Sequence, residues 1–164
     1  MDQVDALLKA TPDQLSALTA KAGLLVFEGE WEQAEATCVR VFSIDPRSAR
    51  CHFVIGLARQ REKRFKEAWE SLDRAYQSNP RFWEPLFQQG TIALEAGDFV
   101  AAVEKFGQVV KLSPSPQAFD SLGVASVRMG DFAKAVDAFQ TALRIDPSFL
   151  PARRNLALAL QKRQ

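Results

Sequence analysis

The chain repeats itself at an interval of 33 or 34 residues. Three residue types recur in step: prolines at Pro46, Pro80, Pro114 and Pro147, alanines at Ala34, Ala68, Ala102 and Ala135, and small residues at Ala22, Gly56, Gly90 and Gly123. Because all three keep the same interval, composition alone does not produce the pattern. An interval of this length is typical of a solenoid whose units are pairs of helices. The repeat therefore predicts an all-α chain.

Placing each of these prolines at repeat position 32 divides the chain. The predicted parts are a short helical arm at 1–14, four units at 15–48, 49–82, 83–115 and 116–149, and a capping helix at 150–164. The small residue at position 8 and the alanine at position 20 are expected where the two helices of a unit cross. A large side chain at position 24, such as Phe139, should fill the space around that crossing. Glycine at position 15 should end the first helix in the left-handed conformation, and in the second unit Lys63 replaces it.

The fourth unit carries a family pattern. Leu122-Gly123 lies in its first helix, Gly130-Asp131-Phe132 in its turn, and Ala135, Phe139 and Ala142 in its second helix. These residues resemble the tetratricopeptide (TPR) repeat. The resemblance implies an all-α TPR solenoid, a right-handed superhelix of antiparallel helix pairs. It also implies a non-catalytic module that binds a peptide or helical segment of another protein in its concave groove.

In known TPR arrays, positions 2, 5, 9 and 12 of each first helix line that groove, because steps of three and four return to one helical face. We call these positions the groove stripe. Here they carry apolar residues flanked by charged ones, which suits peptide binding better than a merely wet surface. The candidate binding residues are Arg50, Phe53, Leu57, Arg61, Glu84, Phe87, Thr91, Leu94, Val124, Val127, Arg128 and Arg154. Two alternatives remain: curvature could bury the stripe between neighbouring helices, or Val4, Leu7 and Leu8 could fold back into the groove.

One TPR ligand is disfavoured. The clamp for the C-terminal carboxylates of heat-shock chaperones needs lysine, asparagine and arginine at set positions. Neither possible register of this chain supplies them; the first, for example, places Thr19, Gly23 and Val54 there.

Charge is distributed unevenly along the chain, although the net charge is +1. Residues 1–37 contain seven acids and two bases, whereas residues 47–66, here named the basic block, contain seven bases and one acid. The acidic first unit of one copy could therefore bind the basic second unit of another, which makes a self-assembling scaffold an alternative function. Nucleic-acid binding is disfavoured because few aromatic residues lie among the bases.

A third alternative is a translocator chaperone of bacterial type III secretion. Those proteins are similar in length, with an N-terminal helical arm and three repeats, and the segments 58–60 and 80–82 are faintly similar to them. The four predicted units and short arm depart from that pattern.

The sequence offers no expected catalytic site, metal or cofactor. His52 is the only histidine, no phosphate-binding glycine loop occurs, and Cys38 and Cys51 are expected to be buried reduced thiols. No stretch is long and apolar enough for a membrane span, and the acidic N-terminus does not resemble a secretory signal, so we expect a cytoplasmic protein. The starting methionine and the capped end suggest a complete small protein.

Overall fold

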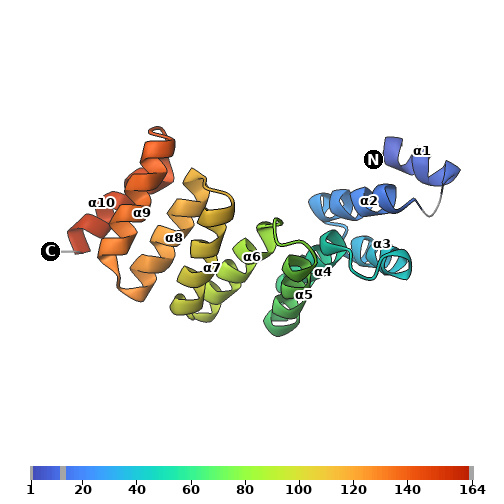
Figure 1. Cartoon of the computed structure of the whole chain (residues 1–164), viewed down its shortest axis with the longest axis horizontal. Helices are drawn as coiled ribbons and strands as arrows, with labels where there is room; N and C mark the ends of the chain where they lie inside the picture. Colours follow the sequence, from blue (N-terminus) through green and yellow to red (C-terminus); the bar gives the residue numbers. More distant parts are fainter. Residues whose placement is uncertain (1, 12–13, 163–164) are drawn as a thin grey trace. The chain divides into compact units, whose positions relative to one another are not determined.

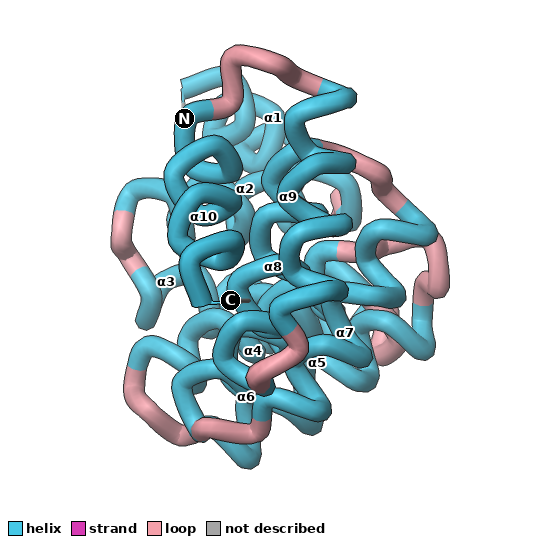
Figure 2. The backbone as a smooth tube through the Cα atoms, turned by 90° about the vertical axis from the view of Figure 1, so that its left-hand side faces the viewer, coloured by secondary structure: helices cyan, strands magenta, loops and turns pink. Residues whose placement is uncertain are grey.

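A computed structural model describes residues 2–11 and 14–162 of the chain (Figure 1). Over these residues the chain forms ten α-helices and no strand, which confirms the all-α prediction. Short loops join successive helices (Figure 2). The chain divides into two compact units, residues 1–85 and residues 86–164, which we name the N-unit and the C-unit. The sequence repeat contains no sign of this division.

The N-unit begins with α1 (Asp2–Ala10), followed by two helix pairs. These are α2 (Leu15–Glu28) with α3 (Trp31–Ile44), and α4 (Ala49–Arg61) with α5 (Phe65–Ser78). Helix α1 lies against α2, where the Lys21 ammonium is 2.6 Å from a carboxylate oxygen of Asp5. Lys21 is not a groove-stripe residue, and Leu7 is 42% exposed, so the described part of α1 does not fill the groove. The side chain of Leu8 lies outside the described residues.

The C-unit holds most of α6 (Glu84–Ala96), which begins just before the division, followed by α7 (Phe99–Leu112). Its second helix pair is α8 (Pro116–Met129) and α9 (Phe132–Ile145), and α10 (Leu150–Lys162) packs on both members of that pair. The helices are anchored by buried side chains on the faces that meet, among them Phe106, Phe139 and Ala152.

The first helix of each pair ends through the same backbone geometry. Gly29, Gly97 and Gly130 have φ angles of +83°, +79° and +88°, and the residue at the same place in the remaining pair, Lys63, has a φ of +61°. Each of the four donates its backbone N–H to the carbonyl three residues earlier, as Lys63 does to Gln60 at 2.9 Å. The left-handed conformation predicted at Lys63 is thus kept, although it disfavours residues with a Cβ.

The acids after these turns behave differently from one another. Asp98 accepts a hydrogen bond from the backbone N–H of Ala101 at 3.0 Å, and Asp131 accepts one from that of Lys134 at 2.9 Å. Both therefore cap the second helix of their pair. Glu30 forms no such bond; instead its carboxylate accepts from the side chain of Gln33 at 3.0 Å.

The predicted close approach at the helix crossing is confirmed. A Cβ added to Gly56 would lie 2.8 Å from the Leu72 side chain, and one added to Gly90 would lie 2.8 Å from the Phe106 ring. At the first pair the sizes are exchanged. Ala22 carries a Cβ there, and the smaller Cys38 stands at position 24, with both residues fully buried.

Candidate functional site

The groove stripe is presented by α2, α4, α6 and α8, the first helices of the four pairs. Its apolar members are half-buried: Val26, Phe53, Leu57, Phe87, Leu94, Val124 and Val127. The core residues of the same helices, such as Leu18 and Val54, are nearly or fully buried. The stripe therefore keeps part of its apolar surface open.

In the N-unit the stripe residues of two neighbouring helices meet around a pocket of about 390 Å³. From α2 the lining includes Thr19, Gly23, Leu24 and Val26, and from α4 it includes Arg50, Phe53 and Leu57. Three predicted binding residues are thus brought together on one helix face. They share this pocket with α2 residues at the same repeat positions.

Phe82 extends this surface, although it was not among the predicted binding residues. Its ring meets the Phe53 ring edge to face, with centroids 5.0 Å apart, and the guanidinium of Arg50 lies 5.8 Å from the Phe82 centroid. Arg50 and Phe82 also line an adjoining hollow with Asp45, Ser48, Ala49 and Asn79. Phe82 lies after α5, outside the first helices, so the stripe rule could not find it.

Arg61 occupies the last position of α4, one helical turn beyond Leu57. Its guanidinium lies 5.1 Å from the centroid of the Trp31 ring, which belongs to the preceding helix pair. Arg61 does not line the N-unit pocket.

The four predicted residues of α6 line neither the N-unit pocket nor the C-unit pocket described below. The Phe87 ring packs on the buried Phe106 ring, with centroids 5.3 Å apart, so Phe87 contributes to the core as well as to the surface. The Thr91 hydroxyl donates to the backbone carbonyl of Phe87 at 3.1 Å. Glu84 and Leu94 are half-buried at the two ends of the helix.

In the C-unit a second pocket of about 320 Å³ lies between α8 and α10. Three predicted residues, Val124, Val127 and Arg128, line it together with Phe139, Asn155, Leu158, Ala159 and Lys162. Arg154 is exposed on α10 and does not line the pocket. Leu158 was missed, yet numbering α10 as a further first helix puts it at position 9, so the same spacing could have found it.

A polar pair borders this second pocket. Asn155 donates its side-chain amide to the Asp120 carboxylate at 2.9 Å, joining α8 to α10. Burial raises the pKa of Asp120 above its usual value, and the bond from Asn155 opposes that shift. At the other end Arg128 lies 5.4 Å from the centroid of the Phe99 ring.

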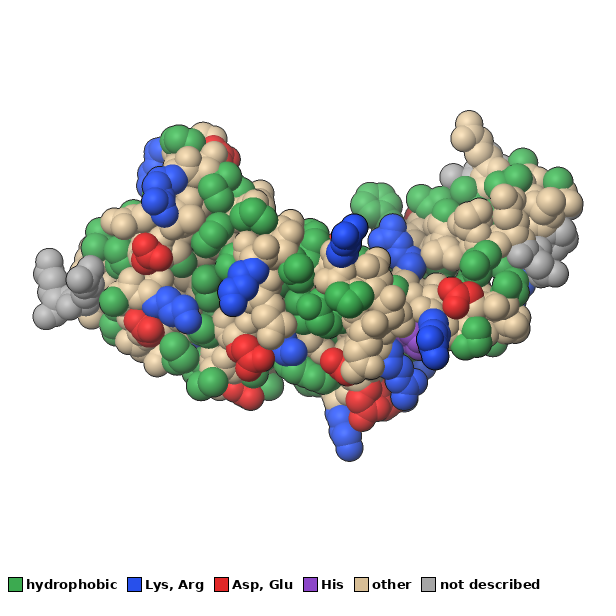
Figure 3. Space-filling view, viewed as in Figure 1, with side chains coloured by type: hydrophobic (Ala, Val, Ile, Leu, Met, Phe, Trp, Pro, Cys, Tyr) green, Lys and Arg blue, Asp and Glu red, His purple; other side chains and the backbone are tan. Residues whose placement is uncertain are grey.

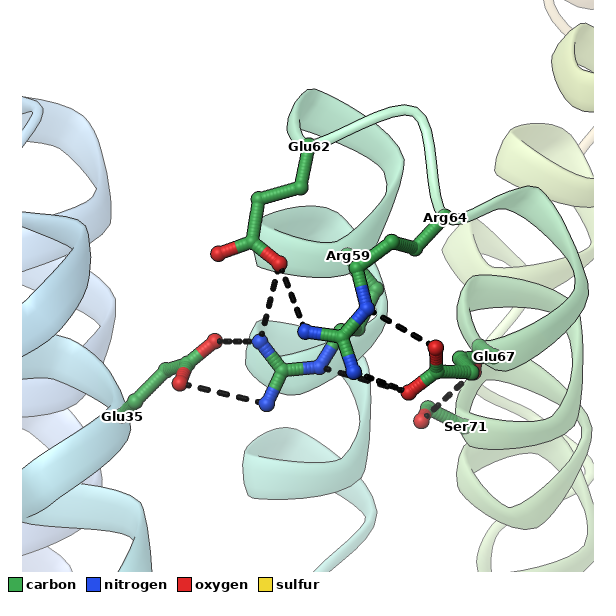
Figure 4. A network of polar contacts seen from close by, with 6 residues as sticks. All are labelled: Glu35, Arg59, Glu62, Arg64, Glu67 and Ser71. Carbon is green, nitrogen blue, oxygen red and sulfur yellow. Dashed lines mark hydrogen bonds and ion pairs between the residues drawn. The ribbon is translucent and has the colours of Figure 1, made fainter.

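Basic side chains gather over α4 and α5, with acidic ones beside them (Figure 3). Arg59 donates to both carboxylate oxygens of Glu35, at 2.7 and 3.3 Å, and lies 3.2 Å from Glu62 (Figure 4). Arg64 pairs with Glu62 at 2.9 Å and with Glu67. Part of the basic block is therefore neutralised within the chain, partly by the acidic first unit that the scaffold hypothesis assigned to another copy.

The buried cysteines and the histidine have structural surroundings. Cys38 and Cys51 are free, fully buried and hydrogen-bonded to each other, and this bond, with burial, raises the pKa of the Cys38 thiol. The His52 ring packs on Phe42, with centroids 4.7 Å apart, and one ring nitrogen is 3.1 Å from the Pro46 carbonyl oxygen. Burial lowers the pKa of His52.

The described residues offer neither a metal centre nor a membrane-spanning helix. They contain no group of three or more histidine, cysteine or acidic side chains placed to hold a metal ion. Of the helices that these residues form, none has both the length and the apolar character needed to cross a bilayer.

Known proteins share this fold. The tetratricopeptide repeat family model matches residues 87–148 and 121–163, and no curated protein matches the chain. Among solved structures, the Pseudomonas aeruginosa PilF structure is 24% identical, with a TM-score of 0.80 over 91% of this chain and 68% of that one. The thermophilic TPR protein TTC0263 of Thermus thermophilus is 24% identical, with a TM-score of 0.74 over 96% of this chain and 87% of that one.

A structure of MamA is 22% identical, with a TM-score of 0.72 over 88% of this chain and 79% of that one. At these identities the structural matches establish the fold alone, which is the predicted TPR solenoid. TPR proteins are generally non-catalytic modules that bind other proteins. With the family match over its C-terminal half and this shared fold, the chain is a tetratricopeptide repeat protein.

Proposed function

We propose that this protein is an adaptor that binds a peptide or helical segment of another protein on its groove stripe. The observation that carries the proposal is the N-unit pocket, where Phe53 and Leu57 remain half-buried around an open volume of about 390 Å³. An apolar floor beside a cationic side chain suits a peptide, because buried anchors supply affinity and polar rims set register.

The C-unit pocket supports the same proposal independently. Its floor is apolar, and Leu158 on that floor is 59% exposed. A partner's apolar side chain that fills such a pocket removes apolar surface from water, which stabilises the complex by about 25 cal/mol per Å².

The scaffold alternative is less well supported, because Arg59 already pairs with Glu35 inside the chain. No specific observation favours a type III secretion chaperone. The proposed partner is therefore another protein, held on the groove stripe without a cofactor.

Partner capture from lysate with a tagged protein tests the proposal. The groove variant combines Leu57→Glu with Leu158→Glu. Its matched control, Val39→Glu with Val100→Glu, makes the same kind of change at positions that are 65% and 69% exposed on α3 and α7. We expect the control to keep the partners of the wild type and the groove variant to lose them, with the helical circular dichroism of both variants unchanged. Partners kept by a folded groove variant would refute groove binding.

The choice of variants follows from the packing. Phe87→Glu would place a carboxylate against the buried Phe106 ring, so loss of binding in that variant could reflect unfolding. Leu158 avoids this ambiguity because most of its side chain is already in water.

A further inference from the structure

Three arginines beside the groove stripe share an unusual setting. The guanidinium groups of Arg50, Arg61 and Arg128 each lie over an aromatic ring, at 5.8, 5.1 and 5.4 Å from the ring centroid. The rings are those of Phe82, Trp31 and Phe99, so every ring belongs to a segment other than the helix that carries the arginine. Stacking of this kind restricts the guanidinium and leaves its N–H groups directed outward in the ring plane.

None of these three guanidinium groups forms an ion pair with a described residue. Arg59 and Arg64 provide the contrast, since both are held by carboxylates of Glu35, Glu62 and Glu67. The arginines of the basic block thus divide into a structural group with internal partners and a stacked group with open donors.

The stacked arginines also border apolar surface. Arg50 lines the N-unit pocket beside Phe53, and Arg61 follows Leu57 by one turn on the same face of α4. Arg128 lines the C-unit pocket, where Lys162 adds a second cation. Each unit therefore combines an apolar floor with at least one cation at its edge.

We propose that the segment bound by this protein is acidic and amphipathic, with aspartate or glutamate side chains that pair with Arg50, Arg61 and Arg128 while neighbouring apolar side chains enter the two pockets. A carboxylate matches the planar fork of a guanidinium and accepts two hydrogen bonds from it. This inference rests on the proposed function, and it adds the chemical class of the ligand.

An acidic peptide fits better than a nucleic acid, which would also supply negative charge. Single strands bind proteins by stacking their bases on open aromatic faces. Here the rings of Phe82, Trp31 and Phe99 already carry a guanidinium, and the pocket floors are largely aliphatic.

The experiment uses a displayed library of random 16-residue peptides, selected on the wild-type chain at low salt. Enriched peptides are synthesised, and their affinities are measured by fluorescence anisotropy. The test variants are Arg50→Gln and Arg128→Gln. Their controls, Lys66→Gln and Lys134→Gln, remove the same charge from exposed positions on α5 and α9. A single-stranded oligouridine is the competing probe.

We expect the selected peptides to be enriched in acidic residues adjacent to leucine, isoleucine or phenylalanine. Their affinity should fall about tenfold, or about 1.4 kcal/mol, for each arginine removed. It should change less than twofold in the lysine controls and decrease as salt is raised. Oligouridine should not displace them.

The outcomes separate the two proposals. Peptides that bind, are lost on Leu57→Glu or Leu158→Glu, and yet carry no acidic bias or ignore the arginine variants would overturn the acidic ligand and leave the groove adaptor standing. Peptides that survive both groove substitutions, or a selection that enriches nothing, would overturn both. Displacement by oligouridine would favour a nucleic-acid ligand and also refute this inference.

Discussion

Adding one methyl group to a glycine should have opposite effects at two places in the C-unit. Gly123 of α8 is buried, and a Cβ there would lie 2.7 Å from the Cδ1 and Cζ atoms of Phe139, which is itself fully buried. Overpacking of this kind costs about 1–3 kcal/mol, whereas alanine in place of glycine improves helix propensity by about 1 kcal/mol. Because a rigid buried ring has little room to move, we expect Gly123→Ala to lower the free energy of unfolding by about 1–2 kcal/mol.

Gly107 of α7 provides the matched control, since a Cβ added there would meet nothing within 4 Å. Only the propensity gain applies, so Gly107→Ala should raise the free energy of unfolding by about 1 kcal/mol. The two variants should therefore differ by about 2–3 kcal/mol, which corresponds to about 1–2 M in the urea midpoint. Urea titrations followed by far-ultraviolet circular dichroism measure both.

A Gly123→Ala variant that unfolds at or above the wild-type midpoint would refute this reasoning, since the close helix crossing would then not constrain position 8. A loss of stability in both variants would instead show that the helix-propensity contribution has been misjudged. Only opposite signs support the packing explanation.

Three further predictions concern single side chains. Lys63→Gly should raise the free energy of unfolding by about 0.5–1 kcal/mol, because the φ of +61° is relaxed for glycine; an unchanged urea midpoint would contradict it. A double-mutant cycle of Glu35→Gln and Arg59→Gln should give a coupling free energy of about 1 kcal/mol, because the pair is bidentate and only 25% and 21% exposed; zero coupling would make the contact incidental. Burial raises the pKa of Asp120, so between its unfolded and folded pKa values the folded state binds more protons, and this carboxyl lowers stability as the pH rises through that window. Asp120→Asn should therefore raise the urea midpoint at pH 7 and leave it nearly unchanged at pH 3, and equal effects at the two values would disprove the assignment.

The sequence predicted the helices better than it predicted the site. Helix ends follow from local chemistry, such as the left-handed turn at Gly130 and the Asp131 cap, and these can be read from a few neighbouring residues. The stripe rule likewise placed Phe53 and Val124 on pocket walls. It did not anticipate that Phe87 would pack against Phe106, because the same apolar side chain suits a core or a groove.

Residues outside the repeated first helices were the main omission. Phe82 lies after α5, and its contact with Phe53 depends on how the chain returns from one pair to the next. Asn155 belongs to α10 and reaches Asp120 across 35 residues of sequence. Such contacts have no local signal, since neither the repeat period nor helix propensity specifies which distant residue completes a surface.

The sequence by itself determined the fold, because one interval repeated through prolines, alanines and glycines allows only stacked helix pairs. Tertiary structure alone decided how the charges are used. Arg59 and Arg61 are two residues apart in the same basic block, yet the helical turn directs one to Glu35 and the other onto the Trp31 ring. Charge composition is a property of the sequence, but pairing depends on distance and direction, which exist only once the helices have packed.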